Sequence, residues 1–511
     1  MGVTTPSRNR SEAPQVKKAT APVRASHVNT GTAVSRAQLS PGGVGRREFR
    51  HPKLRAEMES TDSTAYGGLA LAARLAARLR VPQAIDARLS LLRSHRPFHE
   101  SDHVLTHVYN LFVGGTAIED IADLQHSEPV RRILGASRIP DPSTAGDFLR
   151  RFNETAVKEL DCAIDEIHGR AWRSFYGAKK AKRGVVDLDS HVRHVYGNQK
   201  EGADFTYKGG FGYHPLVISL AGTQECLRLV NRPGNVSSAE GAAAHLKELV
   251  PMLRSRFQDV LVRGDSAFAR QEIFEVCDEH GLSFAMVSPA HRNFEEIAES
   301  LPNCSWQPFL PHEVRPARGS RRRKRGVNRR RRCARRRGKR DLKLEKQWIA
   351  EIDYRPARSE RTYRLIVRRQ RIEESNQGEL FEMWRYRYVI SNLPKSVPTD
   401  QVVRETYRRC DQENVIEQLQ GGIAAMRMPT GGFLANHAFL VCARLAHNLK
   451  AWLAMLALPV ETMRWEWKRF RKAFVYIAAR VVLTAGAHVL RLAGSHRFAG
   501  EIQGGIVRLQ T

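Results

Sequence analysis

The stretch Gly184-Val-Val-Asp-Leu-Asp-Ser-His191 predicts a short apolar strand that delivers aspartates at its end. A second stretch, Val260-Leu-Val-Arg-Gly-Asp-Ser266, has the same form with a single aspartate. A third, Arg409-Cys-Asp-Gln-Glu-Asn-Val-Ile416, predicts a helix that carries Glu413. Open α/β sheets bind ligands at the carboxyl ends of their strands. Carboxylates that meet there form an all-oxygen site suited to Mg²⁺ or Mn²⁺.

Each of these acidic residues also has an ordinary structural explanation. Asp265 can cap a following helix, and Glu413 can form a solvated i,i+4 pair with Arg409. Asp187 and Asp189 can be turn residues, but strand alternation puts both on one face. Two carboxylates on one face repel each other unless a cation compensates. The ordered combination therefore favours a metal site over coincidence.

The charge of the chain is concentrated in two stretches. The sequence has 83 Lys and Arg against 53 Asp and Glu, a formal net charge of +30. Residues 1–55 contribute +9, and residues 315–340 hold sixteen Lys and Arg without an acid. Such a balance favours a polyanionic partner such as double-stranded DNA. The alternative for the tract is a solvated charge segment without a ligand.

Within the arginine tract, phosphate contacts would depend on charge and would not read sequence. The residues that we predict to bind DNA in this way are Arg321, Arg322, Arg323, Lys324, Arg325, Arg329, Arg330, Arg331 and Arg332. A second basic stretch interleaves Trp465, Trp467 and Phe470 with arginine and lysine. Those rings can stack on DNA, and packing on a helical core explains them equally well.

Cysteine usage and hydropathy indicate where the protein works. The seven cysteines form no C-x-x-C pair, which fits a reducing cytosol. The N-terminus lacks the apolar core of a signal peptide. The longest apolar run, 438–460, contains Arg444, His447 and Lys450, so we expect a buried helix rather than a membrane span. We expect a cytoplasmic, nucleoid-associated protein of a bacterium that has no membrane partner.

Periodicity and composition divide the chain into five parts, and the 148 residues between Asp265 and Glu413 exceed any normal connection within a domain. The predicted fold class is α/β, a mixed sheet with flanking helices. The parts are a disordered basic tail (1–57), an N-terminal helical domain (58–178), the catalytic α/β domain (179–290 with 401–455), a β-rich insertion with the arginine tract (291–400) and a basic C-terminal segment (456–511).

Several ordered motifs resemble bacterial insertion-sequence transposases with a DDE domain of the group 1 type. The resemblance covers about residues 65–500 and implies a ribonuclease-H-like core, two divalent metal ions and cut-and-paste movement of DNA. The motifs are Asp-Leu-Asp-Ser-His ending at His191, Tyr207-Lys-Gly-Gly-Phe-Gly-Tyr-His-Pro-Leu216, Arg232-Pro-Gly-Asn235, Arg263-Gly-Asp-Ser266, Arg409-x-Asp-x-Glu-Asn414, Gly114-Gly-Thr-Ala-Ile-Glu-Asp120, Pro142-Ser-Thr144, Asn436 and Asn448.

The resemblance assigns the three catalytic and metal-holding carboxylates. The first aspartate falls on Asp189, because Ser190 follows it as a hydroxyl residue. His191 stands where the family commonly has Thr, so Asp187 stays open as an alternative ligand or a supporting partner. The second aspartate is Asp265, and the glutamate is Glu413. Two Mg²⁺ or Mn²⁺ ions would be held there.

The glutamate helix of related transposases carries a Tyr–Arg–Glu–Lys signature that grips the DNA end. Arg409 matches it, and both Arg409 and Tyr407 are predicted to bind DNA. Tyr407 lies one residue closer to Glu413 than the signature requires, and Gln420 stands at the lysine position. These departures keep open a catalytically inactive DNA-binding derivative.

The resulting functional hypothesis is a DNA transposase that cuts element ends as an endonuclease and transfers the strand into target DNA. Its partners would be terminal inverted repeats and target DNA, bound by a homodimer. A metal-dependent structure-specific nuclease is the alternative within the same fold. It would cut DNA without joining it.

Overall fold

The computed structural model describes residues 62–510 apart from 198, 311–341, 358 and 375–382. The predicted basic tail, 1–57, and the arginine tract, 315–340, lie outside the described residues, so both stay predictions. The described part combines a helical region, one large mixed sheet and two small sheets.

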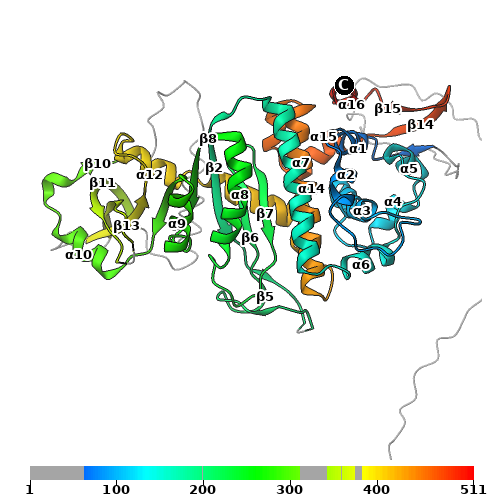
Figure 1. The fold of residues 1–511 in the computed structure, drawn as a ribbon. Helices are drawn as coiled ribbons and strands as arrows, with labels where there is room; N and C mark the ends of the chain where they lie inside the picture. Colours follow the sequence, from blue (N-terminus) through cyan, green and yellow to red (C-terminus); the bar gives the residue numbers. More distant parts are fainter. Residues whose placement is uncertain (1–61, 198, 311–341, 358, 375–382, 511) are drawn as a thin grey trace, which may run out of the picture. The chain divides into compact units, whose positions relative to one another are not determined.

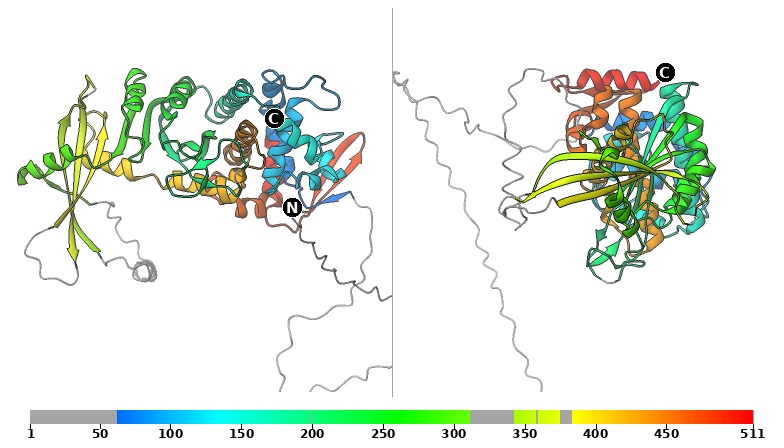
Figure 2. Two further views of the ribbon diagram at one scale, coloured as in Figure 1. Left: turned by 90° about the horizontal axis from the view of Figure 1, so that it is seen from below. Right: turned by 90° about the vertical axis from the view of Figure 1, so that its left-hand side faces the viewer.

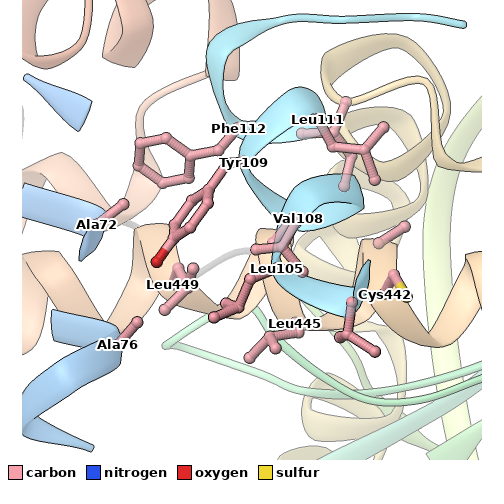
Figure 3. Packing of buried hydrophobic residues seen from close by; sticks show 14 of the residues in the cluster. Ala72, Ala76, Leu105, Val108, Tyr109, Leu111, Phe112, Cys442, Leu445 and Leu449 are labelled. Atoms are coloured by element: carbon pink, nitrogen blue, oxygen red, sulfur yellow. The ribbon is translucent and has the colours of Figure 1, made fainter. Parts of the chain in front are cut away.

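The first part of the described chain is mainly helical, as the periodicity predicted. Its helices pack with α14 (Phe433–Leu456), a long helix that contacts α1, α3, α7 and strand β7. Figure 3 shows apolar side chains of α1, α3 and α14 meeting in this core. The helices are α1 (Leu69–Arg78), α2 (Val81–Asp86), α3 (Glu100–Val113), α4 (Ile121–Gln125), α5 (Glu128–Leu134), α6 (Pro142–Leu149) and α7 (Glu154–Tyr176).

Helix α14 accounts for the longest apolar run of the sequence. By length and composition it could cross a membrane, but 94% of its most apolar window is buried inside the structure. Its polar side chains have partners there: Arg444 pairs with Asp161 and Asp165 of α7, and Asn448 accepts a hydrogen bond from the Cys226 amide. The segment is a buried core helix in this structure, as its polar interruptions predicted.

Five strands form the centre of the large sheet, in the order β7-β6-β2-β8-β9. Strands β2, β8 and β9 are parallel, whereas β6 and β7 are antiparallel to β2 and to each other. This order and these directions confirm the predicted ribonuclease-H-like mixed sheet. The bounds are β2 (Ala181–Ser190), β6 (Leu216–Leu220), β7 (Glu225–Val230), β8 (Phe257–Gly264) and β9 (Ser283–Ser288).

Helices cover both faces of this sheet, because alternate residues of its strands are apolar on opposite sides. Val260 and Val262 of β8 face the cluster that includes α8 (Ala242–Arg256) and α9 (Gln271–Glu279). Leu261 faces the opposite cluster, which contains α12 (Thr399–Tyr407). Figure 1 shows α8 in front of the central strands.

The strands expected in the β-rich insertion extend the same sheet. Strand β13 pairs antiparallel with β9, so the full order continues β9-β13-β12-β11-β10. Because an unpaired β9 would leave an open sheet edge, this pairing also removes a site of aggregation. Figure 2 shows the long twisted strands in yellow. They are β10 (Gln307–Pro308), β11 (Leu342–Tyr354), β12 (Tyr363–Glu374) and β13 (Met383–Ser391), with helix α10 (Arg292–Ser300) beside them.

The C-terminal segment packs back on the helical core. Trp467 and Phe470 of α15 (Trp467–Phe474) are fully buried, so the packing explanation of these rings is correct and the DNA-stacking one is wrong. Trp465 is partly buried. Strands β14 (Ala479–Thr484) and β15 (Ala487–Leu492) form a small sheet with β1 (Ser63–Thr64), and α16 (Ala499–Gln510) contacts α1.

Candidate active site

Strand register brings the first two predicted carboxylates together. In the parallel β2–β8 pair, Leu188 lies opposite Gly264. Asp189 and Asp265 are the next residue on each strand, so they leave the sheet at the same level. Burial raises the pKa of Asp189, Arg409 opposes this, and the negative charge of Asp265 adds to the rise. The pair is therefore a place where negative charge is concentrated.

Asp265 also has the local role that an isolated Gly-Asp-Ser would suggest. Its Oδ1 accepts a hydrogen bond of 2.9 Å from the Ala267 amide. Helix α9 begins only at Gln271, so Asp265 caps the turn after β8 rather than the helix. One carboxylate oxygen is thus used by the turn, which fixes the side chain at the strand end.

Asp187 does not share this position, although it lies on the same strand. It is fully buried, and both of its oxygens accept hydrogen bonds from Arg263, at 2.7 Å from Nε and 2.8 Å from Nη2. The third nitrogen of Arg263 donates to the carbonyl of Glu405 at 2.9 Å. Asp187 is thus an ion-pair partner that ties β2 to β8, with both oxygens occupied. This arrangement favours Asp189 over Asp187 as the first metal ligand.

Arg409 reaches into the site from the junction of α12 and α13 (Cys410–Glu417). Its Nη2 donates to the Leu188 carbonyl at 2.8 Å and lies 3.4 Å from Oδ2 of Asp189. Its Nε is buried and has no hydrogen-bond partner among the described residues. The structure thus gives Arg409 an inward ion pair with Asp189, where the ordinary explanation expected a solvated pair with Glu413.

Glu413 is exposed on the first turns of α13. The preceding residue, Gln412, is buried, contacts the Ser219 hydroxyl and donates to the Val217 carbonyl at 3.1 Å. Val217 is the cross-strand partner of Asp189, so this turn of α13 lies at the level of the strand end. No three His, Cys, Asp or Glu side chains form a metal-binding group within the described residues. The structure therefore brings Asp189 and Asp265 together and leaves Glu413 outside that pair.

The other two positions of the expected clamp lie apart from Asp189. Tyr407 ends α12, and the guanidinium of Arg368 on β12 lies 5.1 Å from its ring. Gln420 belongs to a π-helical turn, Gln418–Gly422, that follows α13 directly. Such a turn bonds i to i+5 and changes which residues share a helix face. Residue spacing counted on a regular α-helix therefore misplaces the position seven residues after Glu413.

A second polar contact supports the strand end from below. The ring of His214 is buried, with Nε2 2.9 Å from the Ser190 hydroxyl and Nδ1 3.0 Å from the Val236 carbonyl. Since a carbonyl only accepts, Nδ1 carries the proton and Nε2 accepts from Ser190. Ser190 is thereby held in place beside Asp189.

Arg263, Gln412 and His214 have roles here that the sequence interpretation did not assign. A signal for Arg263 was available. If Asp189 and Asp265 leave parallel strands at one level, the residues two positions earlier, Asp187 and Arg263, must lie opposite each other, and the register shows that they do. Gln412 and His214 act through contacts with distant segments and have no comparable local signal.

Residues 47–511 match the model of a protein family described as transposase DDE domain group 1. The chain belongs to this family. No curated protein matches the transposase. Among solved structures, the piggyBac transposase synaptic complex with hairpin DNA matches at 10% sequence identity and a TM-score of 0.33, over 80% of this chain and 82% of that chain. At that TM-score the likeness supports no argument about this transposase.

The donor chemistry of the site suits a divalent metal ion. Asp189 and Asp265 offer carboxylate oxygens, the ligands that hard cations such as Mg²⁺ prefer. Their mutual repulsion is relieved here only in part, by the single cation Arg409 at 3.4 Å from Asp189. A metal ion between them would complete that compensation, so the residues present fit such a group.

Proposed function

We propose that this transposase is encoded by an insertion sequence, cuts the ends of its element and joins them to target DNA with divalent metal ions. The observation that carries the proposal is the register of β2 and β8, which places Asp189 beside Asp265 in a chain of the DDE family. Asp189, Asp265 and Glu413 are the proposed ligands. When bound, two such ions would supply activation of the attacking oxygen and stabilisation of the leaving oxygen.

Glu413 can join the two aspartates at little cost. No hydrogen bond or ion pair of Glu413 is present in the described part of the chain, and its side chain is exposed. Gln412 fixes the backbone of the same helical turn against β6. A change of side-chain rotamer therefore costs Glu413 no existing contact.

Arg409 has two tasks in the proposal. In the structure it offsets the charge of Asp189 from 3.4 Å. Its unpartnered Nε is a donor left over for a phosphate oxygen of the DNA. A guanidinium can hold a phosphate by two parallel hydrogen bonds, which would orient the scissile group next to the carboxylates.

The proposal includes the partners and the place of action. Double-stranded DNA, both element ends and target, would bind to a homodimer, and the arginine tract would add contacts that depend on charge alone. A cytoplasmic, nucleoid-associated location in a bacterium is part of the same proposal. The net charge of +30 supports a nucleic-acid partner.

The decisive experiment compares Asp189→Ala, Asp265→Ala and Glu413→Ala with Glu417→Ala, an exposed glutamate one turn further along α13. We expect loss of Mg²⁺-dependent cleavage of a DNA element end in the first three, with DNA affinity within about twofold of the parent, because the carboxylates hold metal and do not attract phosphate. Glu417→Ala should cleave like the parent.

Other outcomes separate the alternatives. Retained cleavage in Asp189→Ala with loss in Asp187→Ala would move the first ligand by two residues. Cleavage without strand-transfer products on a substrate with inverted-repeat ends would indicate a nuclease. Binding without any cleavage by the parent protein would indicate an inactive derivative.

A further inference from the structure

A small aromatic hairpin projects from the end of the sheet that carries Asp189. We use this name for residues 204–213, which contain β4 (Asp204–Phe205), a tight turn and β5 (Phe211–Tyr213). With β3 (Arg193–His194) it forms a separate three-stranded sheet in the order β3-β5-β4. Figure 1 shows β5 beyond the lower end of β6.

The aromatic hairpin exposes more aromatic surface than a folded protein normally leaves uncovered. The ring-bearing side chains of Phe205 and Tyr207 are 71% and 67% exposed, and Tyr196 in the adjoining loop is 100% exposed. Phe205 and Tyr207 are two positions apart with Thr206 buried between them, so they project from the same side. Clustered exposed rings of this kind mark a binding surface.

The hairpin is held rigidly to the strand end. Gly234 passes so close that a Cβ there would lie 2.2 Å from the Gly212 carbonyl and 2.3 Å from that of Asp204. The side chain of Arg232 donates to the His214 carbonyl at 2.8 Å, and the ring of His214 contacts Ser190. Since Ser190 adjoins Asp189, the anchor of the hairpin and the carboxylate site share one short piece of backbone.

Positive charge accompanies the exposed rings. The Nζ of Lys208 lies 5.5 Å from the centre of the Tyr207 ring, and Lys208 is exposed at the turn. Arg193 of β3 has a buried Nε without a hydrogen-bond partner among the described residues. Both cations lie close enough to His191 to lower its pKa, after the larger effect of burial. They therefore flank the strand end that carries Asp189.

We propose that the aromatic hairpin is a stacking platform for unpaired DNA bases next to the cleavage site. Phe205 and Tyr207 would stack on the bases, and Lys208 and Arg193 would contact the phosphates between them. The inference rests on the proposed function, because it takes the Asp189 site as the place where the strand is cut.

Unpaired bases fit these features better than an intact duplex does. Every base has a π-face, but in a duplex those faces are covered by neighbouring bases, and only phosphates and groove edges are accessible. Exposed rings interleaved with cations are the usual surface for single strands. The cations distinguish this surface from a purely apolar protein-binding patch.

The test measures binding of full-length protein to two fluorescent probes without metal, so that no cleavage is needed. One probe is a forked duplex with 2-aminopurine in an unpaired arm, and the other is the fully paired duplex of the same sequence. Loss of stacking on one base is worth about 1–3 kcal/mol. We therefore expect Tyr207→Ala and Phe205→Ala each to weaken fork binding by at least about fivefold and to leave duplex binding within about twofold.

The matched control is Phe175→Ala, because Phe175 is also an exposed aromatic (37%) but precedes the opposite end of β2. It should leave both affinities unchanged. Tyr207→Phe should retain fork binding and the quenching of 2-aminopurine, which shows that the ring and not the hydroxyl acts. Lys208→Gln should reduce the salt dependence of fork binding by one phosphate contact.

Three results would overturn the inference. Equal weakening of fork and duplex would make the hairpin a general charge surface. Unchanged fork binding in both alanine variants would exclude stacking. A shift to monomer in sedimentation, with unchanged fork preference, would assign the rings to contact with a second copy of the chain. If fork binding follows the expectation but Asp189→Ala still cleaves, the proposed function fails and the platform stands.

Discussion

Replacing Asp187 by alanine tests whether this residue holds a strand together or holds a metal ion. The structure gives Asp187 both oxygens in a two-pronged contact with Arg263, at 2.7 and 2.8 Å, with both side chains buried. Removing the carboxylate leaves a buried guanidinium with only the Glu405 carbonyl as a partner. Breaking a buried ion pair in this way costs about 3–5 kcal/mol.

A double variant sets the control for that number. Asp187→Leu with Arg263→Leu removes both charges and fills part of the same volume, and such replacements are often neutral or stabilising. We therefore expect the apparent melting temperature to fall on the order of 5–10 °C in Asp187→Ala and to return close to the parental value in the double variant. Thermal unfolding followed by circular dichroism measures both.

A metal ligand at position 187 would give the opposite pattern. Without metal, loss of a carboxylate beside Asp189 would relieve repulsion, so the melting temperature would stay constant or rise. Titration with Mn²⁺ would then show lost binding in Asp187→Ala and retained binding in Asp189→Ala. Unchanged stability in Asp187→Ala together with lost Mn²⁺ binding would refute the assignment of Asp187 to the ion pair.

Three further predictions concern the core, the arginine tract and the site. Burial, and then the neighbouring Arg471, lower the pKa of Lys450 to about 7; because the unfolded lysine keeps its proton up to about pH 10, the cost of burial grows as pH falls through that window, and Lys450→Met should stabilise the fold by about 2 kcal/mol more at pH 6 than at pH 9 in denaturant unfolding. An equal gain at both pH values would contradict this. Deleting 315–340 should weaken binding to any DNA and flatten the salt dependence by about 0.9 in slope per lost phosphate contact, measured by anisotropy at several salt concentrations; a constant slope would mean that the tract touches no DNA. Arg409→Lys should keep most DNA affinity but slow cleavage, since a lysine cannot hold a phosphate by two hydrogen bonds, and Arg409→Ala should lose both; parental cleavage rates in both variants would leave Arg409 only its contact with Asp189.

The sequence by itself determined the parts of the fold that depend on neighbouring residues. Apolar runs that end in Asp189 and Asp265 are strand signals of a few residues, and their order with Glu413 identified the family. The switch from helical to strand periodicity after residue 180 likewise lies in the local pattern. Polar interruptions showed that helix α14 is a core element, because a buried cation needs partners that lipid does not offer.

Only the tertiary structure decided which partner each charged group takes. Asp187 and Arg263 are 76 residues apart in the chain, and Arg409 is 220 residues from Asp189. A charge lowers its energy through the nearest opposite charge in space, and no local period records that distance. For the same reason Glu413 is exposed although Arg409 lies one helical turn away: the guanidinium is closer to the carboxylate at the strand end, and the folded sheet places it there.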